Sequence, residues 1–137
     1  MGQDIVVDTD VLIDYFSGVS PGAEAVAQLL REERLAITAL TLFELACGAQ
    51  TEEQLEDLEL LARAARLVSL DGPSALQAGA VYRELRAAGR LLEIADLLIA
   101  GCCLASGLPL LTRNTAHFSR VKGLKLVTAE EILGRTA

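Results

Sequence analysis

Short apolar runs alternate with longer amphipathic stretches along the chain, and the runs end at turn-forming or capping residues. The runs predict strands at residues 5–7, 35–38, 66–70, 108–112 and 125–127. The stretches between them predict helices at residues 9–16, 22–33, 52–65, 72–88, 94–106 and 115–118, with further helices opening at residues 41 and 128. Strands joined by helices indicate an α/β fold with a central, mostly parallel sheet of four to five strands flanked by helices.

Several helix starts carry capping signals. Ser20 and Pro21 are expected to cap the helix at residues 22–33, with the proline at its first turn. Thr128 and Glu131 match a capping box, in which each residue satisfies the backbone N–H of the other. The functional crevice of such a parallel sheet lies beyond the carboxyl ends of its strands.

Composition supports a single domain over residues 1–137. Hydrophobic residues make up 52% of the chain and aromatic residues only 4%, so aliphatic side chains are expected to fill the core. The apolar stretch 97–111 is interrupted by glycine, serine and proline, and it is shorter than the roughly 20 residues of a membrane span. The chain also opens without a secretory pattern, so we expect a cytoplasmic protein with no membrane contact.

Cysteine and histidine offer little candidate chemistry. Cys47, Cys102 and Cys103 have no metal-binding spacing, and we interpret them as reduced core residues of a cytosolic protein. His117, the only histidine, is interpreted as a packed side chain rather than a catalytic base. Carboxylates are therefore the main candidates for a functional site.

The formal net charge of −7 at pH 7 makes the chain repel nucleic acid. An enzyme acting on nucleic acid would then need bound cations and a local basic rim. The candidates for such a rim are Arg83, Arg86, Arg90, Arg113, Arg120 and Lys122. The arginines at 83, 86 and 90 fit an ordinary solvated helix face equally well.

Two acidic residues at element boundaries have both a structural and a functional interpretation. Asp8 follows the first strand, where it lies at the crevice or caps the next helix. Glu44 completes a capping box with Thr41, or it lies in a buried helix start among apolar neighbours. Asp10 and Asp14 are interpreted as solvated helix residues.

Asp96 is the most informative carboxylate. Between residues 94 and 105 it is the only charged side chain, so its helix is expected to be buried. A buried carboxylate requires a cation, a hydrogen-bond donor or a proton, although Asp96 at a helix start also fits a capping role.

Convergence of these three carboxylates would create a cation site. Two carboxylates 4 Å apart repel by about 4 kcal/mol at an effective dielectric constant of 20, and a hard divalent ion relieves that repulsion. Oxygen ligands without histidine or cysteine favour Mg²⁺, or Mn²⁺, over zinc. Such an ion activates water and polarises phosphate, which is the chemistry of phosphodiester hydrolysis.

Four motifs, in order along the whole chain, resemble the PIN-domain ribonucleases, in particular the VapC-type toxins of type II (VapBC) toxin-antitoxin systems. They are residues 5–14 (IVVDTDVLID), 41–48 (TLFELACG), 94–100 (IADLLIA) and 111–114 (LTRN), the last followed by His117 and Phe118. Each motif is weak alone, but four in the family's order are fairly specific.

This resemblance implies a PIN fold, Mg²⁺-dependent endoribonuclease activity on RNA, a homodimer, and a cognate antitoxin whose C-terminal segment lies across the site in a higher assembly. By position, Asp8, Asp96 and Glu44 become metal ligands and catalytic residues. Thr9 and Arg113 become candidates to orient the phosphate. Asn114 stands where many relatives have a fourth acidic residue, and we include it among the catalytic residues although it adds no charge.

Three other functions fit parts of the sequence. Asp8 and Asp10 match the opening of haloacid dehalogenase-like phosphatases, but the late acidic pair of that family is missing. Asp71 follows a strand, as the phosphoacceptor of a signalling domain would, but that function leaves Asp96 unexplained. A catalytically inactive PIN-fold binding module is the third alternative.

Overall fold

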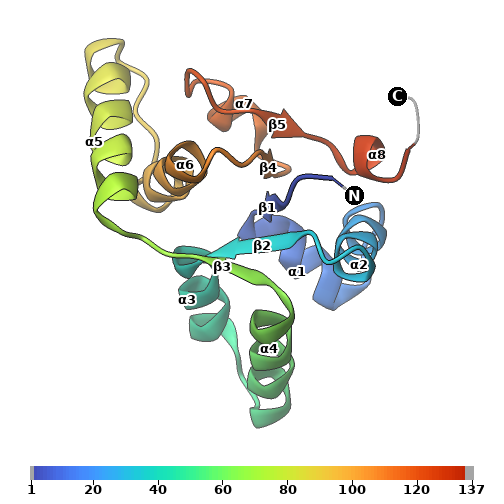
Figure 1. The fold of residues 1–137 in the computed structure, drawn as a ribbon. Helices are drawn as coiled ribbons and strands as arrows, with labels where there is room; N and C mark the ends of the chain where they lie inside the picture. Colours follow the sequence, from blue (N-terminus) through green and yellow to red (C-terminus); the bar gives the residue numbers. More distant parts are fainter. Residues whose placement is uncertain (1, 135–137) are drawn as a thin grey trace.

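The computed structural model describes residues 2–134 and contains a five-stranded parallel sheet. The strands are β1 (Ile5–Val7), β2 (Leu35–Thr38), β3 (Arg66–Val68), β4 (Leu110–Leu111) and β5 (Leu126–Val127), in the order β3-β2-β1-β4-β5. Central β1 pairs with β2 and β4. The expected parallel α/β sheet is thereby confirmed (Figure 1).

Side-chain alternation along β1 explains why the sheet is covered on both faces. Val6 packs into one hydrophobic cluster, whereas Ile5 and Val7 pack into another on the opposite face. All three residues are buried, as expected for a strand between two layers of helices. The last two strands are shorter than their apolar runs predict, and β4 begins only after Pro109, which has no N–H for the ladder.

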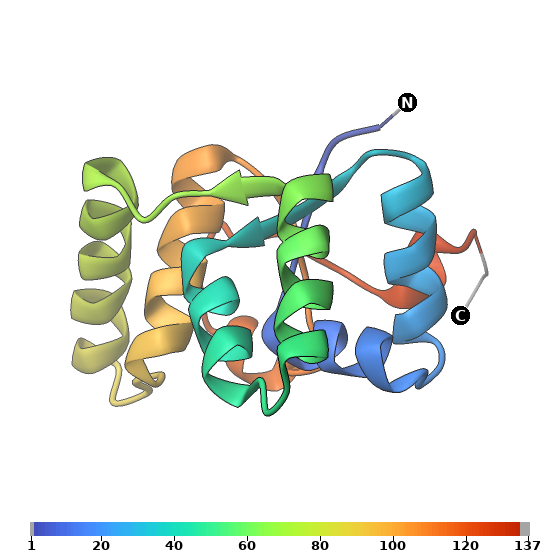
Figure 2. The same ribbon diagram turned by 90° about the horizontal axis from the view of Figure 1, so that it is seen from below.

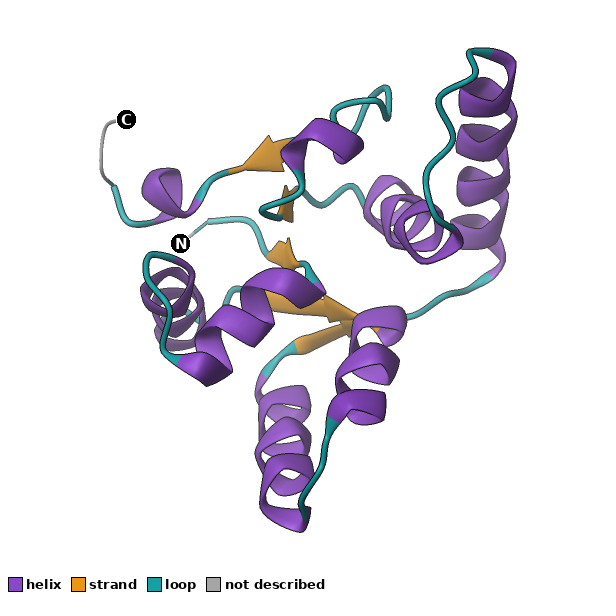
Figure 3. Cartoon of the chain, turned by 180° about the vertical axis from the view of Figure 1, so that it is seen from behind, coloured by secondary structure: helices purple, strands orange, loops and turns teal. Residues whose placement is uncertain are grey.

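Eight helices surround the sheet in the described chain: α1 (Thr9–Ser17), α2 (Gly22–Arg31), α3 (Ala39–Gly48), α4 (Glu52–Ala64), α5 (Gly72–Ala87), α6 (Ile94–Ser106), α7 (Thr115–Phe118) and α8 (Ala129–Ile132). Helices α5, α6 and α7 supply core residues to one face, and α1, α2, α4 and α8 to the other. Figure 3 shows the strands running between these two groups. The α3 and α4 pair projects from the sheet beside β2 and β3 (Figures 1 and 2).

Of the predicted caps, one is confirmed and one is wrong, and one helix begins earlier than predicted. The capping box of Thr128 and Glu131 is confirmed. The cap proposed for Ser20 is wrong, because its hydroxyl donates to the Glu24 carboxylate and Pro21 occupies the cap position. Helix α3 begins at Ala39 rather than at residue 41, and the hydroxyl of Thr38 accepts the cap hydrogen bond.

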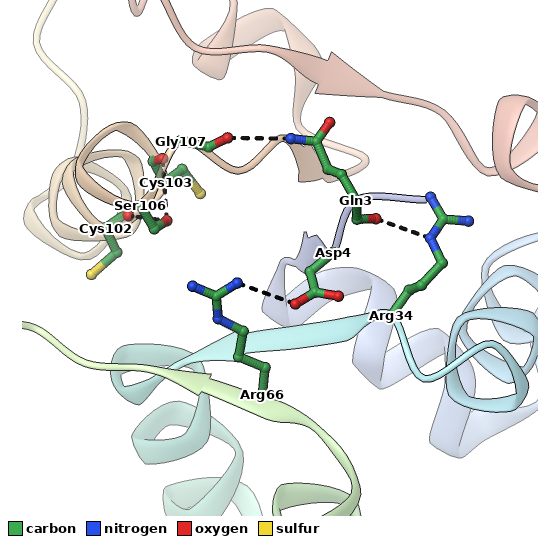
Figure 4. A network of polar contacts seen from close by, with 8 residues as sticks. All are labelled: Gln3, Asp4, Arg34, Arg66, Cys102, Cys103, Ser106 and Gly107. Carbon is green, nitrogen blue, oxygen red and sulfur yellow. Dashed lines mark hydrogen bonds and ion pairs between the residues drawn. The ribbon is translucent and has the colours of Figure 1, made fainter. Parts of the chain in front are cut away.

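A polar network fixes the amino ends of the strands, at the edge opposite the carboxyl ends (Figure 4). Arg34 Nε donates to the Gln3 carbonyl at 2.9 Å, and Gln3 Nε2 donates to the Gly107 carbonyl at 3.3 Å. Arg66 pairs with Asp4 at 3.2 Å. These contacts hold the segment before β1 against β2, β3 and the end of α6.

Burial corrects one interpretation of the cysteines. Cys102 and Cys103 are buried in α6, as expected, but Cys47 is exposed on α3, so it is not a core residue. No helix within residues 2–134 is long and apolar enough to cross a lipid bilayer.

Candidate active site

The candidate site lies where three adjacent strands end. Asp8 directly follows β1, Thr38 ends β2 and Thr112 directly follows β4. Because the strands are parallel, these residues share one edge of the sheet, where α1 and α3 begin.

Asp8 is both a helix cap and a buried carboxylate at this edge. Its Oδ1 accepts from the Thr9 amide at 2.8 Å, and its Oδ2 accepts from the Thr112 hydroxyl at 2.7 Å. The residue is 6% exposed. The pKa of Asp8 is raised from 3.8 to about 6, mainly by burial; the charges of Asp10 and Asp96 add to the rise, and the hydrogen bonds from Thr112 and Thr9 oppose it.

Glu44 is oriented by α1 and not by the start of its own helix. The Thr9 hydroxyl donates to Glu44 Oε1 at 2.7 Å and lies 3.1 Å from the Thr41 hydroxyl. A hydroxyl has one proton, and the carboxylate is the stronger acceptor, so Thr41 donates to Thr9. The capping-box interpretation of Glu44 is therefore wrong, since Thr38 caps α3.

The neighbours of Glu44 are less buried than the sequence suggests. Phe43 is 65% exposed, and Glu44 itself is half-buried. Thr38 and Thr41 beneath it are fully buried. Glu44 thus lies on the surface side of a chain of hydrogen-bonded hydroxyl groups, those of Thr9, Thr41 and Thr38.

Asp96 occupies the first turn of α6 without capping it. The cap position belongs to Glu93, which makes no side-chain cap hydrogen bond. Burial raises the pKa of Asp96, and the charges of Glu93 and Glu44 raise it further, whereas His117 lowers it. Within residues 2–134 we find no hydrogen bond to the half-buried Asp96 carboxylate. The charge of Glu44 thus acts on Asp96, and the charge of Asp96 in turn raises the pKa of Asp8 at the end of β1.

Asn114 reaches the same edge through Thr112. Its backbone amide donates to the Thr112 hydroxyl oxygen at 3.0 Å, and its side-chain amide donates to His117 Nδ1 at 2.9 Å. His117 is exposed, so it is not a packed core residue. The segment after β4 therefore joins Asp8 and Asn114 through one threonine.

Two acidic residues of α1 were misjudged from sequence. Asp14 is 9% exposed, and Asp10 Oδ1 is buried without a hydrogen-bond partner among the described residues, so neither is a solvated surface group. Arg113 pairs with Asp14 at 2.9 Å, and its backbone amide donates to Asp10 Oδ2 at 3.1 Å. The four-residue spacing of the two aspartates, which places them on one helix face, was a signal that could have indicated a shared partner.

A cavity of about 410 Å³ opens beside Glu44. It is bounded by α1, α3 and α4, and its lining includes Thr9, Glu44, Ile13, Phe16, Leu45 and Leu58. Thr9 and Glu44 lie at the end next to the site, and the remainder is lined by apolar side chains together with Ser17, Gln54 and Asp57. The cavity can therefore receive a ligand that is partly apolar and that reaches the carboxylates.

The carboxylate oxygens of the site are the kind of ligand that a hard divalent cation prefers. No group of three acidic, histidine or cysteine residues between positions 2 and 134 is spaced to hold an ion in the present arrangement. The pKa values of Asp8, Asp10 and Asp96 are raised chiefly by burial and in part by neighbouring carboxylates, so their charged forms are disfavoured here. Bringing a cation among these oxygen donors would relieve that repulsion.

The other expected functions find less support in the geometry. Asp71 caps α5 and accepts from the amide and hydroxyl of Ser74, so its carboxylate serves a helix start. Asp10, which a phosphatase would use as an acid or base, is held by the Arg113 amide. Neither arrangement gives a role to Asp96.

Comparison with known proteins gives consistent results. The family model "PIN domain" matches residues 5–124. "Ribonuclease VapC1" of Methanocaldococcus jannaschii is 34% identical over 124 residues, which cover 89% of this chain and 85% of that protein. "Ribonuclease VapC10" of Mycobacterium tuberculosis is 32% identical over 121 residues, with 88% of this chain and 90% of that protein covered.

Solved structures show the same fold. VapBC-1 from nontypeable Haemophilus influenzae matches with a TM-score of 0.79 at 29% identity, over 93% of this chain and 98% of that one. VapBC2 from Rickettsia felis, bound to a fragment of promoter DNA, matches with a TM-score of 0.81 at 21% identity, over 92% and 98% of the two chains.

Proposed function

This chain belongs to the PIN-domain family, with VapC ribonucleases among its relatives, and from this membership we propose that it is a divalent-metal-dependent endoribonuclease. It hydrolyses phosphodiester bonds of RNA as the toxin of a toxin-antitoxin pair. The observation that supports this most directly is the meeting of acidic residues from distant parts of the chain. Asp8 from the end of β1, Glu44 from α3 and Asp96 from α6 lie at one edge of the sheet, where Thr9 bonds to Asp8 and Glu44. There the charge of Asp96 raises the pKa of Asp8, and the charge of Glu44 raises the pKa of Asp96.

The proposed metal ligands are Asp8, Asp96 and Glu44, and the proposed ion is Mg²⁺, with Mn²⁺ as a substitute. All three offer carboxylate oxygens, which these hard ions prefer. Bound there, the ion would neutralise charge on the scissile phosphate and make a water molecule more acidic.

The chain's own residues orient the reacting groups. Thr112 fixes Asp8 Oδ2 and Thr9 fixes Glu44 Oε1. This leaves Glu44 Oε2 as the oxygen that we propose accepts a proton from the attacking water. The water oxygen bonds to phosphorus while the bond to the 3′ oxygen breaks, and the departing oxygen takes a proton. The products then carry a 5′-phosphate and a 3′-hydroxyl. Asn114, anchored to Thr112, is placed to bind substrate or water without adding charge.

RNA approaches a chain whose formal charge is −7, so cations near the site are required. We propose that Arg120 and Lys122, which follow α7, contribute to a basic rim, and that a cognate antitoxin binds this chain as a partner. The matching structure from Haemophilus influenzae is VapBC-1, which supports the antitoxin proposal. The homodimer and the cytoplasmic location are further expectations from the family.

Cleavage by purified variants tests this function. Wild-type protein with Mg²⁺ or Mn²⁺ should cleave RNA to fragments with 5′-phosphates, mapped by sequencing the 5′ ends. Asp8→Asn and Asp96→Asn should each abolish cleavage, since each removes a charged ligand, while the far-ultraviolet circular dichroism stays that of a folded protein. Asp71→Asn, which changes a capping carboxylate outside the site, is the matched control and should still cleave. Metal-independent cleavage, or full activity of either site variant, would contradict the proposal.

A further inference from the structure

We propose that Arg113 is a positioning residue, which with Asp10 and Asp14 holds the 112–114 loop against α1 and so sets the orientation of Asp8. The loop comprises Thr112, Arg113 and Asn114, between β4 and α7. This inference rests on the proposed nuclease function, because it assigns a role toward the same carboxylate site.

Three contacts join Arg113 to α1. The guanidinium Nε pairs with Asp14 Oδ2 at 2.9 Å, and Nη2 donates to the Asp10 carbonyl at 3.4 Å. The Arg113 backbone amide donates to Asp10 Oδ2 at 3.1 Å. Arg113 therefore contacts one face of α1 with both its main chain and its side chain. The two partners Arg113 and Asp10 are 103 residues apart in the sequence.

Burial makes the ion pair a requirement of the fold. The Asp14 side chain is only 12% exposed, and a carboxylate in such a place needs a cation or donors. Arg113 is the one ion-pair partner found for Asp14 in the described chain. Gly22 closes the other side, since a Cβ there would lie 3.2 Å from Asp14 Oδ2. Asp14 thus has little freedom to move, and it offers a fixed anchor to the arginine.

The anchored loop acts on the site through Thr112. The Thr112 hydroxyl oxygen accepts from the Asn114 amide, so its own proton is directed to Asp8 Oδ2. At 2.7 Å, this contact with a carboxylate is sensitive to small shifts of the loop. Release of Arg113 would therefore disturb the orientation of Asp8 without any direct contact between the two side chains.

The position of Arg113 differs from that of a residue dedicated to the phosphate. Thr9 directs its hydroxyl toward Glu44, whereas Asp10 and Asp14 face Arg113. Arg113 also lines a second hollow with Val19, Gly22 and Glu130, away from the cavity beside Glu44. Phosphate orientation by Arg113 is the competing role, and it makes different predictions.

Three variants separate the two roles. Arg113→Gln and Asp14→Asn each break the ion pair, and Arg113→Lys keeps the charge but loses the planar guanidinium. Arg66→Gln is the matched control, because it breaks a similarly exposed ion pair at the opposite edge of the sheet. Mn²⁺ affinity is measured by thermal shift, and RNA affinity by fluorescence anisotropy in EDTA, where cleavage cannot occur.

A positioning role predicts that Arg113→Gln and Asp14→Asn each weaken Mn²⁺ binding by about 10–100-fold, the usual effect of losing a group that orients a ligand. The double variant should be no worse than the single ones, Arg113→Lys should be intermediate, and RNA affinity in EDTA should stay within about twofold. A phosphate role instead predicts that Arg113→Gln weakens RNA binding and reduces its salt dependence by about one ion, while Asp14→Asn does not. That result would overturn the inference.

Amide exchange gives a readout that needs neither metal nor activity. In the metal-free protein, the Arg113 and Asn114 amides should exchange faster in Asp14→Asn than in Arg66→Gln, because their acceptors Asp10 and Thr112 lose their fixed positions. Unchanged protection at both amides would overturn the positioning role. A wild-type protein that neither binds Mn²⁺ nor cleaves RNA would overturn the proposed function, and amide exchange would still decide the question of the loop.

Discussion

At the scale of single residues, Asp8 has two opposite effects on the stability of the folded chain. As a cap it stabilises the start of α1, and as a buried anion it destabilises the folded chain. Its raised pKa has a definite consequence for stability. Below about pH 3.8 the carboxyl is protonated in both states, and as the pH rises through about 6 the folded protein must release a proton that the unfolded chain has already lost. The free energy of unfolding therefore decreases across this window.

We expect Asp8→Asn to remove much of this pH dependence in the metal-free protein. The shift from 3.8 to about 6 corresponds to about 3 kcal/mol at pH 7. Loss of the charged acceptor for Thr112 offsets about 1 kcal/mol, so the variant should be more stable by about 2 kcal/mol at pH 7. Urea unfolding at pH 4 and pH 7 measures both values.

The exposed cap Asp71 provides the contrast. Its pKa is lowered by the hydrogen bonds from Ser74, so its contribution is present above its usual pKa and is lost as the pH falls. Asp71→Asn should therefore reduce stability at pH 7. If the wild-type protein gains stability between pH 4 and pH 7 to the same extent as Asp8→Asn, then the buried Asp8 carboxylate does not lower the free energy of unfolding, and the prediction fails.

The position of a residue was predictable from the sequence where it depended on a single helix or strand. Asp8 was placed at the end of the first strand by the apolar run before it, and Asp96 was placed on a mostly buried helix by its apolar neighbours. The partner of Glu44 was not predictable, because Thr9 lies 35 residues away and Thr41 offered a local alternative. Asp14 was misjudged for the same reason, since its cation is Arg113 on another element.

At the scale of elements, α5 and α6 pack most closely at a glycine. A Cβ at Gly101 in α6 would lie 2.5 Å from the Ser74 carbonyl oxygen and 2.7 Å from Ala78 Cβ, both on α5. The first contact is with backbone, which cannot move aside as a flexible side chain would. Gly79 also lies within a helix, but an added Cβ there meets nothing within 4 Å.

Alanine at these two glycines should have opposite effects. Gly101→Ala should lower the free energy of unfolding by about 1–3 kcal/mol, as overpacking does, because α5 and α6 must move apart. Gly79→Ala should raise it by about 0.5–1 kcal/mol, because alanine favours the helix over glycine. Chemical denaturation of both variants provides the comparison, and equal changes of one sign would show that the contact between α5 and α6 is looser than described.

Element type was read correctly from periodicity, whereas some boundaries were not. The capping box at Thr128 is local, and it was predicted because both partners lie within one turn. Ser20 was predicted to cap α2 on the same kind of signal, but Pro21 occupies the cap position, and the Ser20 hydroxyl donates to the Glu24 carboxylate. The last strands were predicted too long because apolar residues beyond the ladder bury their side chains without pairing in the sheet.

At the scale of the whole molecule, a cation should act as a stabilising ligand. The metal-free site contains carboxylates whose burial and repulsion oppose folding, and an ion that binds only the folded chain stabilises it by mass action. At a concentration one hundred times its dissociation constant the gain is about 2.7 kcal/mol, or roughly 10 °C in Tm for a chain of this size.

Scanning calorimetry with increasing Mn²⁺ measures this effect. Wild-type Tm should rise with Mn²⁺, and the double variant Asp8→Asn with Asp96→Asn should start from a higher Tm and respond little. Binding should also strengthen as the pH rises through about 6, because the ion competes with the proton held by Asp8. A Tm independent of Mn²⁺ in the wild-type protein would favour an inactive binding module.

The central place of β1 governs when the site can exist during synthesis. Residue 8 is synthesised 104 residues before Thr112, yet its carboxylate accepts from the Thr112 hydroxyl and its amide donates to the Leu111 carbonyl. At about 5–20 residues per second, those partners follow at least several seconds later. A nascent chain that has not reached Thr112 therefore lacks the hydroxyl that orients its first acidic ligand, so that cleavage competence arrives only after β4 and Thr112 have joined the sheet.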